Sequence, residues 1–181
     1  MSPTHTCAIS ASDIAKCPIN WGNEQHRKKS VDVDETTADI VDLKQRIRDT
    51  IEALIWTGYT HFLTSATRGI ELWAAEAVLD LEAEYPEVTL EIVVPYTGHS
   101  KKWTAPIKKR YDEVLAQANT VTRLNHENSK GAVFTRNHYL LDNCSSMITA
   151  YYEGSMTETL TGRARRYGKQ VVRIPFMKNA A

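Results

Sequence analysis

The chain has 181 residues, and its 22 lysines and arginines balance 22 aspartates and glutamates. This length fits one domain spanning residues 1–181, because chains of about 100 to 200 residues bury a sizeable core. Balanced charge excludes a general attraction to nucleic acid or anionic lipid, and no segment approaches the roughly 18 apolar residues that cross a bilayer. We therefore expect a cytoplasmic protein with no membrane partner and no preference for nucleic acid.

The cysteines and histidines do not predict a metal centre. Cys7, Cys17 and Cys144 are odd in number and have no CxxC spacing, so neither a disulfide framework nor a zinc site is expected. The six histidines show no HExxH or similar metal-ligand spacing,. We expect reduced thiols and no bound metal.

Hydrophobic periodicity predicts that the chain begins as a strand, a loop and a helix. Residues 4–10 form the expected strand, and residues 11–35 form a loop of the length that is usually functional or disordered,. Apolar residues then recur every three or four positions, which predicts an amphipathic helix that starts near Thr36 and ends at Gly58,.

The rest of the chain repeats this alternation. The further expected elements are a strand at 60–66, a helix at 69–81, a strand at 89–96, a helix at 106–118, a strand at 120–124, a helix at 132–143, a strand at 145–152, a helix at 157–167 and a strand at 170–175,. Such alternation predicts an α/β fold, Rossmann-like and doubly wound, with a mostly parallel sheet and helices on both faces. Ligands of such sheets bind beyond the carboxyl ends of the strands.

Small hydroxyl residues follow the second expected strand. Ser65, Thr67 and Arg68 lead into a helix that begins at Gly69, and a helix N-terminus offers unpaired N–H groups and partial positive charge to an anion. This arrangement suits a phosphate. The alternative is a capped helix with a surface arginine, since neither GxGxxG nor GxxxxGK[ST] is present and Glu71 would satisfy the same dipole.

A second candidate anion site follows the fifth expected strand. Gly154 permits a tight turn, and Ser155 and Thr157 stand at the start of the last helix,. Arg136 lies in the preceding helix, from which its guanidinium could reach the same crevice and pair with phosphate or carboxylate. The alternative for this residue is a solvated arginine on a helix surface.

Three segments occur in a family-specific order: GIELWAAEAVLDLEAEYPEVTLEIVVP, RYDEVLAQANTVTRL and TRNHYLLDNCSSMITAYYEG. With them the chain resembles the YpsA-like branch of the SLOG superfamily, whose relatives include the LOG phosphoribohydrolases and the DprA proteins. The resemblance spans nearly the whole chain and implies a Rossmann-like domain that binds a nucleotide or a nucleotide-derived ligand. By position, Arg136 and Asn137 match the Arg-Asn pair of the family helix, and Gly154 and Thr157 match the ends of its final loop.

The glycine-rich loops of that family are altered in this chain. Family members usually carry a Thr-Gly-His-Arg-Pro type segment after the first strand, whereas a loop without glycine follows Ser10 here. Relatives often have Gly-Gly-Thr in the final loop, where residues 155–157 read Ser-Met-Thr. A side chain at Met156 would obstruct the close backbone approach that glycine allows. Glu158 stands one position out of register with the catalytic glutamate of LOG enzymes.

The leading hypothesis is a binding domain, acting as a sensor or an interaction module, for a small nucleotide or NAD-derived ligand that carries phosphate. The expected ligand contacts are Ser10, Ser65, Thr67, Arg68, Gly69, Arg136, Asn137, Gly154, Ser155 and Thr157. Three aromatic residues stand near strand ends: Tyr96, Trp103 and Tyr152. We expect them either to flank the base of the ligand or to belong to the hydrophobic core. The alternative is nucleotide N-glycosidic hydrolysis of the phosphoribohydrolase kind, in which Arg136 steadies the phosphate and Glu158 or Glu153 is the general base. A partner-binding subunit without ligand is a third hypothesis, and a homo-oligomer is compatible with each.

Overall fold

The computed structural model describes residues 5–14 and 33–176. The strands of this part of the chain are β1 (Thr6–Ala11), β2 (His61–Thr64), β3 (Thr89–Val94), β4 (Thr120–Arg123), β5 (Ser146–Ala150) and β6 (Gln170–Arg173). Its helices are α1 (Ala38–Trp56), α2 (Ile70–Glu82), α3 (Ala105–Gln117), α4 (Ala132–Asp142) and α5 (Met156–Arg166). Strand and helix alternate as the hydrophobic pattern predicts, and the element ends differ from the expected ones by a few residues.

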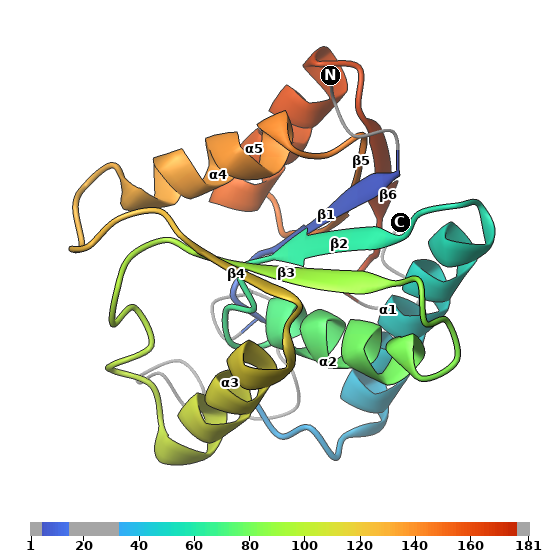
Figure 1. The fold of residues 1–181 in the computed structure, drawn as a ribbon, viewed down its shortest axis with the longest axis horizontal. Helices are drawn as coiled ribbons and strands as arrows, with labels where there is room; N and C mark the ends of the chain where they lie inside the picture. Colours follow the sequence, from blue (N-terminus) through green and yellow to red (C-terminus); the bar gives the residue numbers. More distant parts are fainter. Residues whose placement is uncertain (1–4, 15–32, 177–181) are drawn as a thin grey trace.

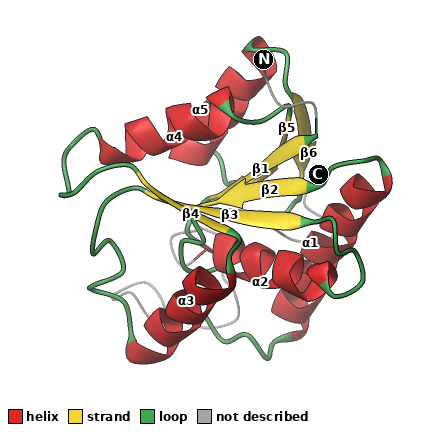
Figure 2. Ribbon diagram, viewed as in Figure 1, coloured by secondary structure: helices red, strands yellow, loops and turns green. Residues whose placement is uncertain are grey.

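The strands form one parallel sheet in the order β4-β3-β2-β1-β5-β6. Helices α1, α2 and α3 cover one face of this sheet, and α4 and α5 cover the other (Figures 1 and 2). The predicted Rossmann-like α/β class is therefore confirmed, and in the described residues the sheet is parallel throughout. From β1 the chain adds β2, β3 and β4 on one side, and it then returns to add β5 and β6 on the other side of β1. Sheets of this kind bind their ligands at the point where the strand order reverses in this way.

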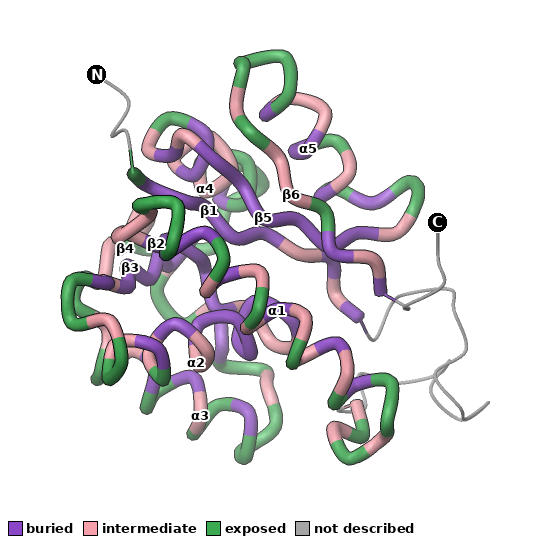
Figure 3. The backbone as a smooth tube through the Cα atoms, turned by 90° about the vertical axis from the view of Figure 1, so that its right-hand side faces the viewer, coloured by how far each residue is buried: buried purple, intermediate pink, exposed green. Residues whose placement is uncertain are grey.

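Strands β1 and β5, which are neighbours inside the sheet, are buried from both sides. The first five residues of β1 and every residue of β5 are inaccessible to solvent (Figure 3). Because helices cover both faces, these strands consist of small or apolar residues rather than an alternation with charged ones. One core cluster lies on the side of α1–α3 and includes Ile47 and Leu72, and the other lies on the side of α4 and α5 and includes Leu140 and Leu160.

The ends of α1 follow the local signals in the sequence. The helix begins after Thr37, whose backbone is extended, and the chain turns at Gly58 with a φ of 98°. That angle lies in the left-handed region that glycine adopts without a steric penalty. Most of the expected loop at 11–35, including Cys17, falls outside the described residues. Within the described part of the chain, each helix is too short or too polar to cross a membrane.

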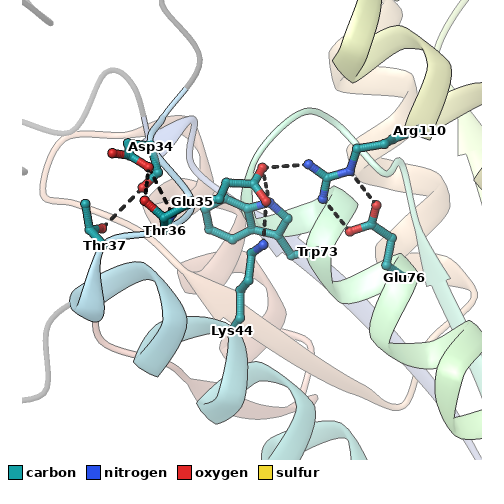
Figure 4. A network of polar contacts seen from close by, with 8 residues as sticks. All are labelled: Asp34, Glu35, Thr36, Thr37, Lys44, Trp73, Glu76 and Arg110. Carbon is teal, nitrogen blue, oxygen red and sulfur yellow. Dashed lines mark hydrogen bonds and ion pairs between the residues drawn. The ribbon is translucent and has the colours of Figure 1, made fainter.

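A network of charged side chains ties the start of α1 to α2 and α3 (Figure 4). Arg110 on α3 donates from Nε and Nη2 to both carboxylate oxygens of Glu76 on α2, at 2.8 and 2.7 Å, and from Nη1 to Glu35 at 2.7 Å. Glu35 also accepts from Trp73 Nε1 at 2.9 Å and from Lys44. Burial alone would raise the pKa of Glu35, but its hydrogen bonds lower it. Bidentate pairing sets both distance and orientation, so this network fixes α3 against α2.

Another buried carboxylate lies on the side of the sheet that α4 covers. Glu91 on β3 is 8% exposed. Its carboxylate makes three hydrogen bonds, with His61 Nε2 at 3.1 Å, Thr122 Oγ1 at 2.7 Å and Tyr139 Oη at 2.6 Å. Burial alone would raise the pKa of this carboxyl, but these partners lower it to about 2. The folded protein therefore stabilises the charged form of Glu91 where β2, β3, β4 and α4 meet.

We expect Glu91→Gln to lower the free energy of unfolding at pH 7 by about 1–3 kcal/mol, because the amide lacks the charge that the surrounding donors stabilise. The folded pKa lies below the ordinary value of 4.5, so the carboxylate stabilises fully above pH 4.5, and this contribution is lost as pH falls towards 2,. Urea unfolding at several pH values measures the effect, and the stabilities of wild type and variant should converge in acid. Glu87→Gln, at an exposed position before β3, is the control. A wild-type advantage that stays constant down to pH 2 would contradict the prediction.

Candidate functional site

The loop between β2 and α2 makes a sharp turn at the carboxyl edge of the sheet. Ala66 has a φ of 48° and Gly69 a φ of 88°, and both angles are uncommon for residues other than glycine. A Cβ on Gly69 would also lie 3.2 Å from Ile14 Cγ2, in the segment after β1. The turn therefore requires glycine at position 69 and brings the segments after β1 and β2 together.

A glutamate fills the start of α2. Glu71 is 2% exposed, and its Oε2 accepts the Thr67 N–H at 3.2 Å. Its Oε1 accepts the Ala11 N–H at 3.0 Å and the Ser10 hydroxyl at 3.4 Å. The carboxylate therefore turns back from the first turn of α2 and accepts backbone N–H groups from the end of β1 and from the loop before the helix, where the partial positive charge of a helix N-terminus also favours an anion.

Arg136 on α4 completes this cluster. Its side chain is 14% exposed, and Nη1 lies 3.3 Å from both Ser65 Oγ and Glu71 Oε1. Its Nε is buried and has no hydrogen-bond partner among the described residues. Because α4 and α2 lie on opposite faces of the sheet (Figure 1), the Arg136–Glu71 pair joins the two helical layers. An arginine that keeps an unpaired N–H in a buried position is suited to binding an oxyanion.

Arg68 pairs with the segment that follows β1. Its Nη2 lies 3.1 Å from Asp13 Oδ2, and the two side chains are 22% and 19% exposed. In the same segment, Ser12 Oγ is buried without a hydrogen-bond partner in the part of the chain that the structure describes. The predicted role of Arg68 at a phosphate thus stays a prediction, and in the structure its guanidinium is paired with a carboxylate.

Helix α5 begins with a capping pair of its own. Ser155 Oγ accepts the Glu158 N–H at 3.2 Å, and Glu158 Oε2 accepts the Gly154 N–H at 2.6 Å. This pattern resembles a capping box, except that the glutamate accepts from Gly154, the residue before the N-cap Ser155, rather than from Ser155 itself,. Glu158, the candidate general base, therefore lies at the start of α5 as a cap.

The other predicted residues of the final loop lie around this cap. Thr157 is 7% exposed, and its carbonyl accepts the Thr161 hydroxyl at 2.7 Å. Met156 is 64% exposed, so its side chain faces solvent rather than filling the interior at the sheet edge. On α4, Asn137 Oδ1 is buried and has no hydrogen-bond partner among residues 5–14 and 33–176.

The structure brings part of the predicted set together. Ser10, Ser65 and Arg136 meet around Glu71, and Thr67 joins them through its backbone N–H rather than its hydroxyl. The final loop stands one strand away, after β5, which is the neighbour of β1. Glu71, at the centre of this cluster, is recognisable in the sequence as an acidic residue in the first turn of a helix. The sequence alone indicates only that its charge competes with a bound anion for the helix dipole.

The loop between β3 and α3 adds an aromatic cluster that sequence reasoning did not identify as a unit. His99 packs edge-to-face against three rings, with centroid distances of 5.9 Å to Tyr96, 4.9 Å to Trp103 and 5.2 Å to Tyr111. Tyr152 stacks instead with Phe176, at 6.4 Å between centroids. A histidine between two aromatic residues in the loop after a strand is the signal that sequence reasoning could have used.

The ionisable groups at this edge of the sheet are arginine, histidine and carboxylate side chains. Within residues 5–14 and 33–176, no group of three or more His, Cys, Asp or Glu side chains is arranged to hold a metal ion. Burial raises the pKa of the Cys7 thiol to about 12 and that of Cys144 to about 11. Both cysteines therefore stay protonated near neutral pH and are poor nucleophiles.

Known proteins resemble this chain over most of its length. The family model described as the YspA SLOG family, YpsA, matches residues 29–173. UPF0398 protein YpsA of Bacillus subtilis strain 168 is 32% identical over 111 residues, which cover 60% of this chain and 62% of that protein. UPF0398 protein RBAM_020340 of Bacillus velezensis is 32% identical over 114 residues, which cover 62% and 63%, respectively. UPF0398 protein SERP1017 of Staphylococcus epidermidis is 30% identical over 111 residues, which cover 60% and 59%. The chain thus spans about three-fifths of the length of these relatives.

We expect Glu71→Gln to lower the free energy of unfolding by about 2–4 kcal/mol. The variant leaves Arg136 without its buried counter-charge and turns an amide N–H towards a backbone N–H. Chemical denaturation at pH 7 measures the loss. Asp80→Asn, on the exposed side of the same helix, is the matched control and should stay within about 0.5 kcal/mol of wild type. Equal stabilities of the two variants would show that the carboxylate does not organise this edge.

Proposed function

This chain belongs to the YpsA family of SLOG proteins, and from that premise we propose that it binds a nucleotide or nucleotide-derived ligand through phosphate. The site is the carboxyl edge of the sheet, where β1, β2 and α4 meet. One observation carries the proposal: Ser65 and Glu71 hold the Arg136 guanidinium at this edge, and its buried Nε lacks a partner in the described part of the chain. Open parallel sheets bind ligands at this edge, close to the reversal of strand order.

Glu71 supports the site as a fixed counter-charge. Its carboxylate accepts hydrogen bonds from Ser10, Ala11, Thr67 and Arg136. A phosphate that displaced it would break all of these bonds and leave a buried carboxylate unpaired, which is unfavourable. The phosphate therefore meets Arg136 on the side of Nε while Glu71 stays in place. An arginine already held in one orientation loses less conformational entropy when a ligand binds.

Hydrolysis of an N-glycosidic bond is the alternative for the same site, and it has less support. That reaction needs a carboxylate at the ribose or at an attacking water. The Glu158 carboxylate is engaged with the Gly154 N–H at 2.6 Å, and a general base there would have to leave its cap. A cytoplasmic location and a role as a sensor or interaction module are also part of this proposal, and their support comes only from the sequence.

We expect AMP, ADP, NAD⁺ or ADP-ribose to raise the stability of the protein, and adenosine without phosphate to do so less. A ligand at about a hundred times its dissociation constant stabilises by about 2.7 kcal/mol, which a thermal-shift assay detects. Arg136→Gln should weaken binding of the active compound about 10- to 100-fold, because it removes a charged donor to phosphate. Arg166→Gln, at an exposed position on α5, is the matched control and should bind as wild type does.

Two outcomes would overturn this proposal. The first is the absence of any stabilisation by the phosphate-bearing compounds, which would favour a partner-binding subunit. The second is release of free base or ribose phosphate from a nucleotide, abolished by Glu158→Gln, which would favour the hydrolase.

A further inference from the structure

Exposed apolar side chains gather on the outer side of α4 and α5. These two helices cover one face of the sheet, and no element of the described chain lies over their outer side (Figures 1 and 2). Four large apolar side chains here are 38% to 64% exposed: Val133, Phe134, Met156 and Tyr167. Apolar side chains that gather on one exposed surface mark an interaction site, whereas scattered ones need no explanation.

A single stripe of residues runs along the outer side of α5. Met156, Thr159, Arg163 and Arg166 follow one another at spacings of three or four residues, so they lie on the same side of the helix,. Phe134 of α4 adjoins this stripe, because the Arg163 guanidinium lies over its ring, 5.1 Å from the centroid. The two helices therefore present one continuous outer surface.

The two ends of α5 carry opposite charges. Glu153 precedes the helix and Glu158 stands in its first turn, whereas the last turn contains Arg163, Arg165 and Arg166. None of the ion pairs within residues 5–14 and 33–176 includes any of these five side chains. The acidic start and the basic end of α5 thus both lack a counter-charge in the described part of the chain.

We propose that this surface binds a second copy of the chain, with α5 of one copy packed antiparallel against α5 of the other. A two-fold axis brings the same patch of both copies together. In an antiparallel pair the acidic start of each α5 faces the basic end of its partner, and the exposed side chains at its two ends, Met156 and Tyr167, approach each other across the interface. A parallel pair would instead place the arginines of both copies side by side.

The same helix in reversed direction thus supplies both the apolar contacts and the missing counter-charges. Gly162 lies near the middle of α5, and no atom lies within 4 Å of the position that a Cβ would take there. The absence of a side chain at this position lets the two backbones approach. This inference is independent of the proposed function, because the interface lies on the outer side of the helices rather than at the buried Arg136–Glu71 pair.

The first test measures the mass of the full chain by size-exclusion chromatography with light scattering over a dilution series. We expect wild type to reach twice the mass of one chain. Met156→Asp should raise the dimer dissociation constant by about tenfold or more, because it places a carboxylate in the apolar part of the interface. A carboxylate in the first turn of a helix is favourable, so this variant should fold.

Val41→Asp is the matched control for this test. Val41 is 54% exposed and stands in the first turn of α1, so the same change is made at an equivalent place in another helix. This variant should dimerise as wild type does. A wild type that stays monomeric at every concentration, or a dimer that Val41→Asp and Met156→Asp weaken equally, would overturn the inference and leave the proposed function standing.

The second test examines the antiparallel direction through charge reversal. Arg166→Glu and Glu153→Arg should each raise the dimer dissociation constant by about tenfold, because each sets like charges against each other across the interface. The double variant restores opposite charges and should dimerise more tightly than either single variant. Added salt should weaken the wild-type dimer, since these charges are exposed to solvent,. A double variant no tighter than the single variants would overturn the antiparallel arrangement.

Discussion

The buried carboxylate of Glu71 is the constraint on which the arrangement of the carboxyl edge depends. It accepts hydrogen bonds from the end of β1, from the turn after β2 and from Arg136 on α4. A carboxylate removed from water must keep such partners, because an unpaired buried charge is strongly destabilising. The three segments lie far apart in the chain, and α4 belongs to the helical layer opposite that of α2, which carries Glu71. Movement of any one of them would leave Glu71 short of a donor, so their positions are coupled.

At two of the helix starts along this edge, those of α2 and α5, glutamate side chains of the chain itself accept backbone N–H groups. Glu71 fills the start of α2, and Glu158 with Ser155 caps α5. In glycine-rich phosphate loops, backbone N–H groups of a helix start bind the ligand directly. Here acidic side chains accept from loop N–H groups instead, and under the proposed function side-chain donors such as Arg136 would hold the anion. A chain with altered glycine-rich loops can in this way keep an anion site at the edge its fold provides.

Carboxylates also fix the helical layers elsewhere in the molecule. Glu35 joins the start of α1 to α2 and α3 through Trp73 and Arg110, and Glu91 joins three strands to α4. Backbone hydrogen bonds determine strand register, whereas side-chain packing holds the helices on the apolar sheet surface,. Charge-assisted hydrogen bonds have narrow geometry and therefore further restrict the positions of α1, α2, α3 and α4,. The site geometry depends on this positioning, because Arg136 and Glu71 come from opposite layers.

Local sequence patterns determined the order of strands and helices and the α/β class, and motif residues identified the family and placed the candidate site at the strand ends. These properties follow from the spacing of apolar residues over a few positions and from turn residues such as Gly58 and Gly69, which act where they stand in the chain. Tertiary structure alone decided that Arg136 pairs with Glu71, 65 residues away, and that His99 packs among Tyr96, Trp103 and Tyr111. Those contacts depend on how two helical layers pack across a sheet and on side-chain rotamers, and neither leaves a periodic signal in the sequence.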